Sequence, residues 1–515
     1  MGIMQFMDRA APLALDPAIA LLGNEEQGAA FDWAAMRGFI RDRVTGANNW
    51  LGDPNAKVTY ASPSAKWIWN AFGVLTSGTT LRCDHDPASL DSSMTPLNSL
   101  GIGSGAVVNK SIVLASGTFS YPVGEVVRIT DAADISKWIL GRVVSWTAGT
   151  KTLVVAGYAA SGSYVSGSNW KVIVALGIRI ESQRTNLLLR SDDFTATWQK
   201  VGTTTPSANS FRETSADSVH YVRQSVVFPD GSGSLSLDLK SAGRKVSLQI
   251  ETGGLYANRC EADIDIDAGT TSRILNNGTY AGASVTFGPV DTDGYRRVTL
   301  AFSTGAKVGD GSVFAVIRTL GAADVTSFVG DPTKGVDIRR AQLEVGAFAS
   351  SYIPTTTAQV TRAADNISLA TALFPYSSVS GVLAADFVPA QGTSSNVAAV
   401  IRDSGGTVYS ALLGSTGSLA QFVVRDGGAS QASLASTHAR TRTKMAGAYK
   451  ANDFRVSIDG AAVLSDTSGT VPAGISVLQF GAFTGSANVI DGWIRNTRYF
   501  PRATVTDAEL QAWAA

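Results

Sequence analysis

Apolar and polar residues alternate along much of this 515-residue chain. From residue 177 onward, segments such as GSLSLDLKS, KVSLQIET and CEADIDID follow one another, with a turn every eight to twelve residues. Successive side chains of a strand point to opposite faces of a sheet, so alternation is typical of strands that bury one face. Many strands at this spacing are typical of a sandwich. The pattern therefore predicts a jelly-roll β-sandwich over residues 177–365.

The stretch 341–355, AQLEVGAFASSYIPT, ends that sandwich. Its first five residues alternate as a strand does, and Pro354 biases the residue before it toward extended backbone. We predict that this stretch is the closing strand of the sandwich followed by its exit. In this interpretation Tyr352 and Ile353 hold the exit against the sandwich and do not contact a ligand.

Residues 366–515 repeat the alternating pattern and predict a second sandwich. This region closes with TVTDAELQAWAA, which indicates a short helix capped by Thr506 or Asp507. Leu510 and Trp513 would hold that helix against the sheet.

Three regions precede the jelly roll. Residues 105–176 carry five short strand patterns and predict a small β-barrel-like module, while residues 57–104 are interpreted as a β leader or linker. In residues 1–56, apolar positions between Phe31 and Val44 recur at helical spacing and predict a helical N-terminal region. Such a helix must bury its apolar stripe on its own domain, on copies of itself or on another protein.

The composition narrows the function classes. Charged residues make up 16% of the chain and the formal net charge is zero, which argues against nucleic acid or an anionic membrane as partner. The 52 glycines fit short strands joined by tight turns, so the chain should be mostly β. Apolar runs stay below the roughly 18 residues of a membrane span, and the start lacks the basic segment of a signal peptide. We expect a soluble protein, made in the cytosol, without membrane insertion.

Catalytic and metal chemistry leave no clear signature in the sequence. A Ser-His-Asp order, a zinc spacing and a phosphate loop are all missing, so we expect no catalytic residue, no cofactor and no enzyme. Cys83 and Cys260 lie far apart and are expected to be two buried thiols. The triplet Asp84-His85-Asp86 falls in a strand-like segment, where its histidine would face away from both carboxylates, so we expect no metal site there.

A row of carboxylates in EADIDID offers an alternative. Glu261, Asp263, Asp265 and Asp267 occupy every second position and would share one face of a strand. Their oxygens could hold a structural calcium ion. The commoner interpretation of such a row is a solvated face.

Several long stretches resemble a known family. SQRTNLLLRSDDFTATW, DGYRRVTLAFS and AQLEVGAFASSYIPTTTAQVTRAAD together resemble the middle sandwich of bacteriophage fibre and head-spike-fibre proteins. ASPSAKWIWNAFGVLTSGTTLRCDHDP is similar to the leader of that sandwich, and residues 105–176 resemble a small β module inserted between the two. KMAGAYKANDFRVSIDGAAV and GWIRNTRYFPRATVTDAELQAW resemble a concanavalin-A-like sandwich of laminin-G type. Residues 1–56 match no part of the family.

The resemblance implies a fibre or spike on the virion surface that binds carbohydrate of the bacterial host. Residues 1–56 would attach it to other virion proteins, and bacterial surface polysaccharide would be its ligand. A homotrimer is expected, because several weak sites on one particle bind with high avidity. Two alternatives stay open: a glycan-cleaving enzyme on the same scaffold, and a purely structural connector or capsid decoration.

Glycan binding needs exposed aromatic rings beside polar side chains. Four residues of the predicted jelly roll fit this description, although a packed ring is the commoner role for each. In Arg184-Thr185-Asn186, by contrast, a buried arginine or asparagine would tie loop carbonyls together, so this motif is predicted to be structural. The glycan-binding candidates are Trp198, Tyr221, Tyr256 and Tyr280.

Overall fold

The computed structural model describes most of the chain from residue 108 onward and seven short strands before it. The described residues are 27–32, 37–42, 50–52, 59–61, 66–69, 75–78, 83–92, 108–117, 119–123, 125–131, 138–161, 170–252, 258–291, 293–305, 311–389, 395–438, 442–484 and 487–515. Of these, the side chains are described only for residue 27 and for those within 29–32, 111–157 and 170–515.

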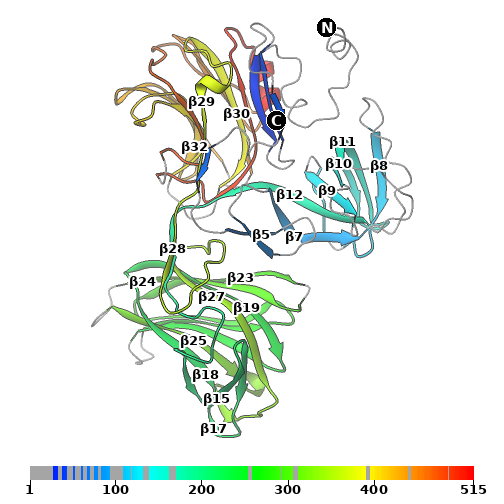
Figure 1. Cartoon of the computed structure of the whole chain (residues 1–515), viewed down its shortest axis with the longest axis vertical. Helices are drawn as coiled ribbons and strands as arrows, with labels where there is room; N and C mark the ends of the chain where they lie inside the picture. Colours follow the sequence, from blue (N-terminus) through cyan, green and yellow to red (C-terminus); the bar gives the residue numbers. More distant parts are fainter. Residues whose placement is uncertain are drawn as a thin grey trace. The chain divides into compact units, whose positions relative to one another are not determined.

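The chain divides into two compact units. One is continuous, Gln183–Ala363, and the other combines Met1–Ser182 with Ala364–Ala515. The continuous unit is therefore inserted into the sequence of the other. It is drawn in green in Figure 1.

The continuous unit is the predicted jelly roll, built from two six-stranded antiparallel sheets. One sheet has the order β14-β18-β25-β20-β21-β22 and the other β15-β16-β27-β19-β24-β23. The chain crosses between the sheets from β16 to β18, then to β19 and to β20, which is the winding of a jelly roll. The strands are β14 (Gln199–Val201), β15 (Thr203–Ser207), β16 (Ser210–Glu213), β18 (Tyr221–Val227), β19 (Gly231–Ala242), β20 (Lys245–Glu251), β21 (Arg259–Asp265), β22 (Thr270–Asn277), β23 (Tyr280–Val290), β24 (Arg296–Thr304), β25 (Ser312–Leu320) and β27 (Gly335–Val345).

Two short strand pairs complete this unit. β13 (Arg184–Asn186) pairs with β28 (Val360–Arg362), and β17 (Asp217–Val219) pairs with β26 (Ser327–Val329). The first pair joins the entrance of the unit to its exit.

The core of the jelly roll follows the alternation of its strands. Leu235 and Leu237 of β19 and Leu248 of β20 are fully buried in one apolar cluster. Cys260 belongs to the same cluster as a free, buried thiol, and burial raises the pKa of that thiol to about 12. This confirms the prediction for Cys260, whereas the side chain of Cys83 lies outside the described residues.

The other unit contains a second sandwich of two antiparallel sheets, in agreement with the predicted concanavalin-A-like class. One sheet runs β37-β36-β35-β30-β39 and the other β34-β33-β32-β31-β38-β29-β4. Its strands are β4 (Thr59–Ala61), β29 (Asn366–Ala370), β30 (Ser380–Val388), β31 (Ser395–Arg402), β32 (Tyr409–Thr416), β33 (Leu419–Asp426), β34 (Ala429–Thr437), β35 (Thr443–Lys450), β36 (Phe454–Ile458), β37 (Leu464–Asp466), β38 (Val477–Phe480) and β39 (Gly492–Phe500).

The C-terminal helix α2 (Asp507–Ala514) covers part of this sandwich as predicted. Thr506 caps it, since its hydroxyl accepts a hydrogen bond from the backbone N–H of Glu509 while the Glu509 carboxylate accepts one from Thr506. Leu510 is buried, and the ring of Trp513 stacks on Phe500 with centroids 4.7 Å apart.

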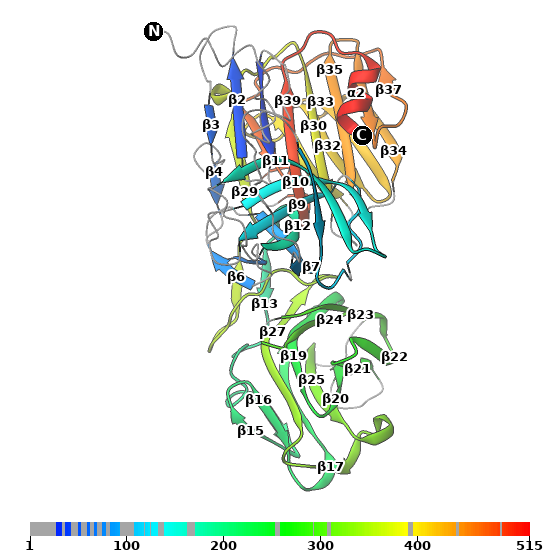
Figure 2. The ribbon, with the colours of Figure 1, turned by 90° about the vertical axis from the view of Figure 1, so that its right-hand side faces the viewer.

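The predicted N-terminal helix is wrong. Residues 27–32 form strand β1 (Gln27–Asp32) and residues 37–42 form β2 (Arg37–Asp42), which pair antiparallel, and β1 also pairs with β39. Figure 2 shows these blue strands beside the red strand β39. Phe31 enters the main core, while Ala30 enters a second core on the opposite face of the sheet. Because both faces of β1 are covered, Ala29, Ala30 and Phe31 are all apolar, and the strand lacks the alternation that would have identified it.

The small β module lies in the sheet order β12-β9-β10-β11-β8. Strand β12 continues past the expected domain boundary at residues 176 and 177, and its last residues pair with β39. The predicted boundary therefore falls inside a strand. The strands of the module are β8 (Val108–Val113), β9 (Val126–Asp131), β10 (Trp138–Thr147), β11 (Thr152–Ser161) and β12 (Trp170–Ile180). The strands that precede it in the sequence and have not yet been given are β3 (Trp50–Gly52), β5 (Lys66–Trp69), β6 (Leu75–Gly78) and β7 (Cys83–Ser92).

Candidate functional site

One sheet of the jelly roll has a polar and charged outer face. Residues such as Val222, Leu248 and Ile317 enter the core, so their sequence neighbours point away from it. The strand register places these neighbours in three rows across the sheet. The rows are Tyr221, Arg318, Ser247, Asp263 and Arg273; then Gln199, Arg223, Val316, Gln249 and Glu261; then Ser225, Phe314, Glu251 and Arg259.

At the β21–β22 end of this face, arginines cover buried carboxylates. Glu261 accepts hydrogen bonds from Ser247 Oγ at 3.0 Å, Arg259 Nε at 2.9 Å and Arg273 Nη2 at 2.5 Å. Asp263 accepts one from Arg273 Nε at 2.7 Å. Burial alone would raise the pKa of Glu261, but Arg273, Ser247 and Arg259 together bring that pKa below its usual value.

This arrangement corrects the interpretation of EADIDID. Glu261 and Asp263 are nearly fully buried, so the row is not a solvated face, and arginines from its own and the next strand occupy their oxygens. Asp265 is half-buried and Asp267 is exposed. Among the described residues, no three His, Cys, Asp or Glu side chains are grouped so that they could hold a metal ion.

Nearer β14, two arginines face one carboxylate. Arg223 Nη1 lies 3.6 Å from Glu251 Oε1, and its guanidinium lies 4.1 Å from the centroid of the Phe314 ring. Arg318 Nη2 donates to Gln249 Oε1 at 3.0 Å, and Gln249 Nε2 donates to Glu251 Oε2 at 3.0 Å. Burial raises the pKa of Glu251, and the attraction of Arg223 and Arg318 only partly offsets this.

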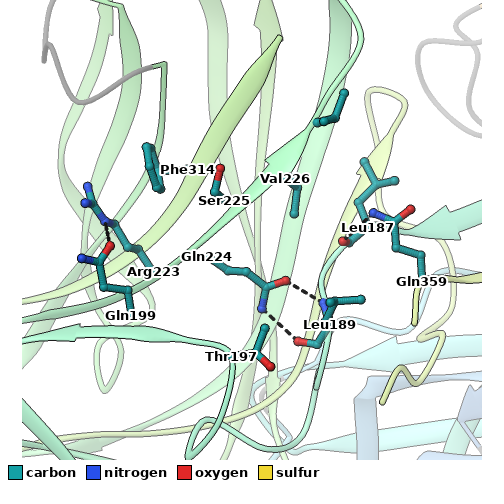
Figure 3. A pocket seen from close by; sticks show the side chains of 11 residues that line it. Leu187, Leu189, Thr197, Gln199, Arg223, Gln224, Ser225, Val226, Phe314 and Gln359 are labelled. Atoms are coloured by element: carbon teal, nitrogen blue, oxygen red, sulfur yellow. Dashed lines mark hydrogen bonds between the residues drawn. The ribbon is translucent and has the colours of Figure 1, made fainter. Parts of the chain in front are cut away.

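A pocket of about 590 Å³ opens beside β14, next to Arg223 (Figure 3). Gln224 fixes one wall, because its side-chain amide accepts from Leu189 N at 2.7 Å and donates to Leu189 O at 3.0 Å. Across from it, Arg223 Nε donates to Gln199 Oε1 at 2.8 Å. The lining residues are Leu187, Leu189, Thr197, Gln199, Arg223, Gln224, Ser225, Val226, Val227, Phe314 and Gln359.

The pocket lining combines apolar side chains with hydrogen-bonding groups and one positive charge. Arg223 is the single charged side chain among its eleven lining residues. Thr197, Ser225 and Gln359 add hydroxyl and amide groups, which can both donate and accept hydrogen bonds. Such a lining suits a small ligand that carries several hydroxyl groups.

Two predicted glycan-binding residues are buried, which contradicts their role as stacking platforms. The ring of Trp198 is 3% exposed and packs on Phe194 with centroids 4.6 Å apart. Tyr280 is also 3% exposed, and its hydroxyl lies 2.7 Å from Thr252 Oγ1. Both residues are part of the jelly-roll core, where an aromatic ring contributes apolar area and its polar atom finds a partner.

The other two candidates have different outcomes. Tyr221 is half-buried on the polar outer face, between the guanidinium groups of Arg223 and Arg318, which lie 5.5 and 6.0 Å from its ring centroid. Tyr256 lies outside the described residues.

Sequence reasoning missed Arg223, although the alternation in YVRQSVV places it on the same face as Tyr221. Its partner Phe314 is far away in sequence, so alternation within one strand could not identify it.

The structural interpretation of Arg184-Thr185-Asn186 is confirmed. Asn186 Nδ2 donates to the carbonyls of Ala341 and Ile353 at 3.0 and 2.9 Å, which ties the entrance of the jelly roll to its exit. The predicted role of Tyr352 is confirmed as well, since this residue is buried and its hydroxyl donates to Asp192 Oδ2 at 2.6 Å.

Comparisons with known proteins add little to this picture. No protein-family model matches the chain, and no curated protein matches it. A structure described as NanB plus optactamide is 17% identical with a TM-score of 0.24, and the match covers 28% of this chain and about a quarter, 26%, of that one.

Two further similar structures are laminin G-type modules. The LG4-5 domains of the mouse laminin α1 chain are 9% identical with a TM-score of 0.21, and the match covers 60% of this chain and 95% of that one. The LG1-3 region of the laminin α2 chain is 7% identical with a TM-score of 0.19, covering 87% and 96%. These scores are too low to carry an argument, so the sandwich architecture rests on the sheet order described above.

A membrane-spanning helix was also sought. Among the residues that the structure describes, no helix is both long and apolar enough to cross a bilayer.

Proposed function

We propose that this chain is a non-enzymatic fibre or spike of a phage-type virion that binds bacterial surface polysaccharide through the pocket beside β14. The observation that carries the glycan-binding part is the pocket itself, about 590 Å³ in volume and lined by amide, hydroxyl and guanidinium groups together with apolar side chains. Its size lies within the range of roughly 300–1,000 Å³ that is typical of small-molecule sites. The virion part is supported by the sequence resemblance to phage fibre proteins.

The remaining parts of the proposal follow from this function. A homotrimer on the particle surface would raise the avidity of one weak sugar site without new contacts. Attachment to other virion proteins would use the N-terminal region. Because β1 pairs with β39, such an attachment would hold the second sandwich directly.

A pocket-blocking substitution tests the site. Ser225 is exposed and lines the pocket, so Ser225→Trp should fill it and weaken binding to bacterial surface polysaccharide at least about tenfold. Ser433, an exposed residue of β34 in the other sandwich, provides the control Ser433→Trp. Binding would be measured by biolayer interferometry against capsular polysaccharide and lipopolysaccharide from a panel of bacteria. Equal binding by both variants and the parent would remove the pocket from the proposal, and no binding by the parent would remove glycan recognition.

A second candidate function, glycan cleavage, is favoured by one observation. Glu251 and Glu261 lie on the neighbouring strands β20 and β21. Burial raises the pKa of Glu251, whereas the pKa of Glu261 is lowered because Arg273, Ser247 and Arg259 outweigh its burial. Glycosidases use one protonated and one ionised carboxyl group. Here, however, hydrogen-bonded arginine and amide groups cover both carboxylates.

A reducing-end assay separates the two functions. Under the binding proposal, the purified protein releases no new reducing ends from the polysaccharides that it binds. If the parent released new reducing ends and Glu251→Gln did not, cleavage would be established instead.

A further inference from the structure

We propose that the pocket beside β14 selects a sugar that carries a carboxylate, and that Arg223 binds this group. This inference rests on the proposed glycan binding and narrows its ligand class. Arg223 is the single charge among the eleven lining residues, and none of those residues is acidic. A ligand that fills the pocket with a negative group is therefore electrostatically complementary to its lining, whereas a neutral sugar leaves Arg223 with only its long ion pair to Glu251.

The neighbourhood of Arg223 does not supply this compensation well. Its ion pair with Glu251 has an N–O distance of 3.6 Å, compared with the roughly 2.7–2.9 Å of a charge-assisted hydrogen bond. Arg318 faces the same carboxylate and is only 5% exposed, and its own hydrogen bond goes to the neutral amide of Gln249. Arg318 Nε has no hydrogen-bond partner. Two cations thus share Glu251, and this end of the sheet face carries an excess of positive charge.

The position of the Arg223 guanidinium is fixed before any ligand binds. Its Nε donates to Gln199, and its plane lies over the Phe314 ring at 4.1 Å. Because Nε is occupied by Gln199 and Nη1 is too far from Glu251 for a hydrogen bond, the Nη1 and Nη2 edge of the guanidinium can offer two N–H donors, which match the two oxygens of a carboxylate. A preorganised fork loses little side-chain entropy on binding. The geometry therefore favours a carboxylate over a hydroxyl group, which can use only one of the two donors.

The test compares acidic polysaccharides with their own neutral forms. Polygalacturonate, hyaluronan and polysialic acid would each be used as the free acid and after reduction of the carboxyl group to an alcohol, which leaves the linkage unchanged. We expect the full-length protein to bind at least one acid about tenfold more tightly than its reduced form, since only the acid can accept charge-assisted hydrogen bonds from the guanidinium. In Arg223→Gln this ratio should fall to about one, and in Arg223→Lys, which keeps the charge without the fork, it should be intermediate.

Arg425→Gln is the matched control, because it removes one positive charge from the other sandwich, where Arg425 donates to the carbonyl of Gly428. This variant should keep the parent ratio. The inference would be overturned if the parent bound the acid and its reduced form equally well, or if Arg223→Gln kept the parent ratio. It would also be overturned if Arg223→Gln melted like the parent but no longer bound either form. Binding only to neutral bacterial glycans overturns it but leaves the proposed function intact, whereas absence of all glycan binding overturns both.

Discussion

Single buried polar residues hold the ends of the jelly roll together. Asn186 is fully buried, and besides its two donated hydrogen bonds its Oδ1 accepts from the backbone N–H groups of Leu188 and Leu343 at 3.1 and 3.2 Å. Every hydrogen-bonding position of one amide thus serves the backbone where the chain enters and leaves the unit. This role was predictable from its place before the apolar run 187–189, because a buried amide must satisfy its polar atoms.

Removal of this amide should destabilise the jelly roll. We expect Asn186→Ala to lower the free energy of unfolding by about 3 kcal/mol, because it leaves buried backbone groups without partners. Urea denaturation followed by tryptophan fluorescence would measure the change. The neighbouring Thr185→Ala removes an exposed hydroxyl that lies 2.8 Å from Thr361 Oγ1, and should cost less than about 1 kcal/mol. Equal costs for the two variants would contradict the role assigned to Asn186.

A buried ion pair in the second sandwich predicts a dependence of stability on pH. Asp386 is 3% exposed and accepts from Arg442 Nε and Nη2 at 2.9 and 2.6 Å. Burial alone would raise the pKa of Asp386, but Arg442 lowers it below the ordinary value of 3.8. The stabilisation is therefore complete above pH 4 and is lost as the pH falls below the ordinary pKa.

Asp386→Asn should make this dependence visible. At pH 7 the substitution should cost about 1–3 kcal/mol, because Arg442 loses the charge of Asp386 and keeps only Glu125 as a carboxylate partner. The difference in melting temperature between the parent and the variant should shrink as the pH is lowered from 7 to 3. A difference that stays constant over this range would show that the carboxylate charge contributes nothing.

At the scale of elements, strand β12 links the small β module to the second sandwich. It pairs with β9 along its first part and with β39 at its end. Gly177 lies between these pairings with φ of +103°, a conformation that side-chain-bearing residues rarely adopt. A Cβ at this position would lie 2.2 Å from the carbonyl oxygen of Ile494.

Gly177→Ala should therefore separate steric exclusion from backbone strain. Gly428 has a similar φ of +95°, but a Cβ there would meet no atom within 4 Å. We expect Gly428→Ala to cost about 1–2 kcal/mol from strain alone, and Gly177→Ala to cost at least about 2 kcal/mol more. Thermal unfolding by circular dichroism would compare them, and equal costs would indicate that the β12–β39 contact relaxes without penalty.

Local patterns identified the elements whose signal lies within one short segment of the sequence. The cap at Thr506 and the closing strand at 335–345 were predictable, because caps and alternation are properties of short segments. The strand around Phe31 was mistaken for a helix because the apolar positions between Phe31 and Val44 recur at helical spacing, and its pairing with β39 at the opposite end of the chain leaves no local signal. The pocket was missed for the same reason, since it combines Arg223 with Phe314 and Gln359.

At the scale of the whole molecule, the two units have separate hydrophobic cores. Phe31 belongs to the core of the second sandwich, and Phe211 belongs to that of the jelly roll. Each core closes around strands of its own unit, so the units can unfold in separate cooperative steps.

Calorimetry of paired variants tests this independence. Phe31→Ala and Phe211→Ala should each cost about 3–5 kcal/mol, because both rings are nearly fully buried. We expect two heat-absorption transitions, with each substitution lowering the temperature of a different one. A single transition that both substitutions lower would show that the units unfold together. If Phe31→Ala lowered neither transition, the interpretation of residues 1–56 as a separate region would be restored.

The pairing of β1 with β39 has a consequence for synthesis on the ribosome. Ala29 is made 470 residues before its partner Tyr499. At the usual 5–20 residues per second, β1 must wait roughly 25–90 s for that partner, while the whole jelly roll emerges in the interval. The inserted unit can thus fold first, and the surrounding sandwich closes only when the last strands leave the ribosome. During this delay the apolar edge of β1 is open to chaperones and to neighbouring nascent chains.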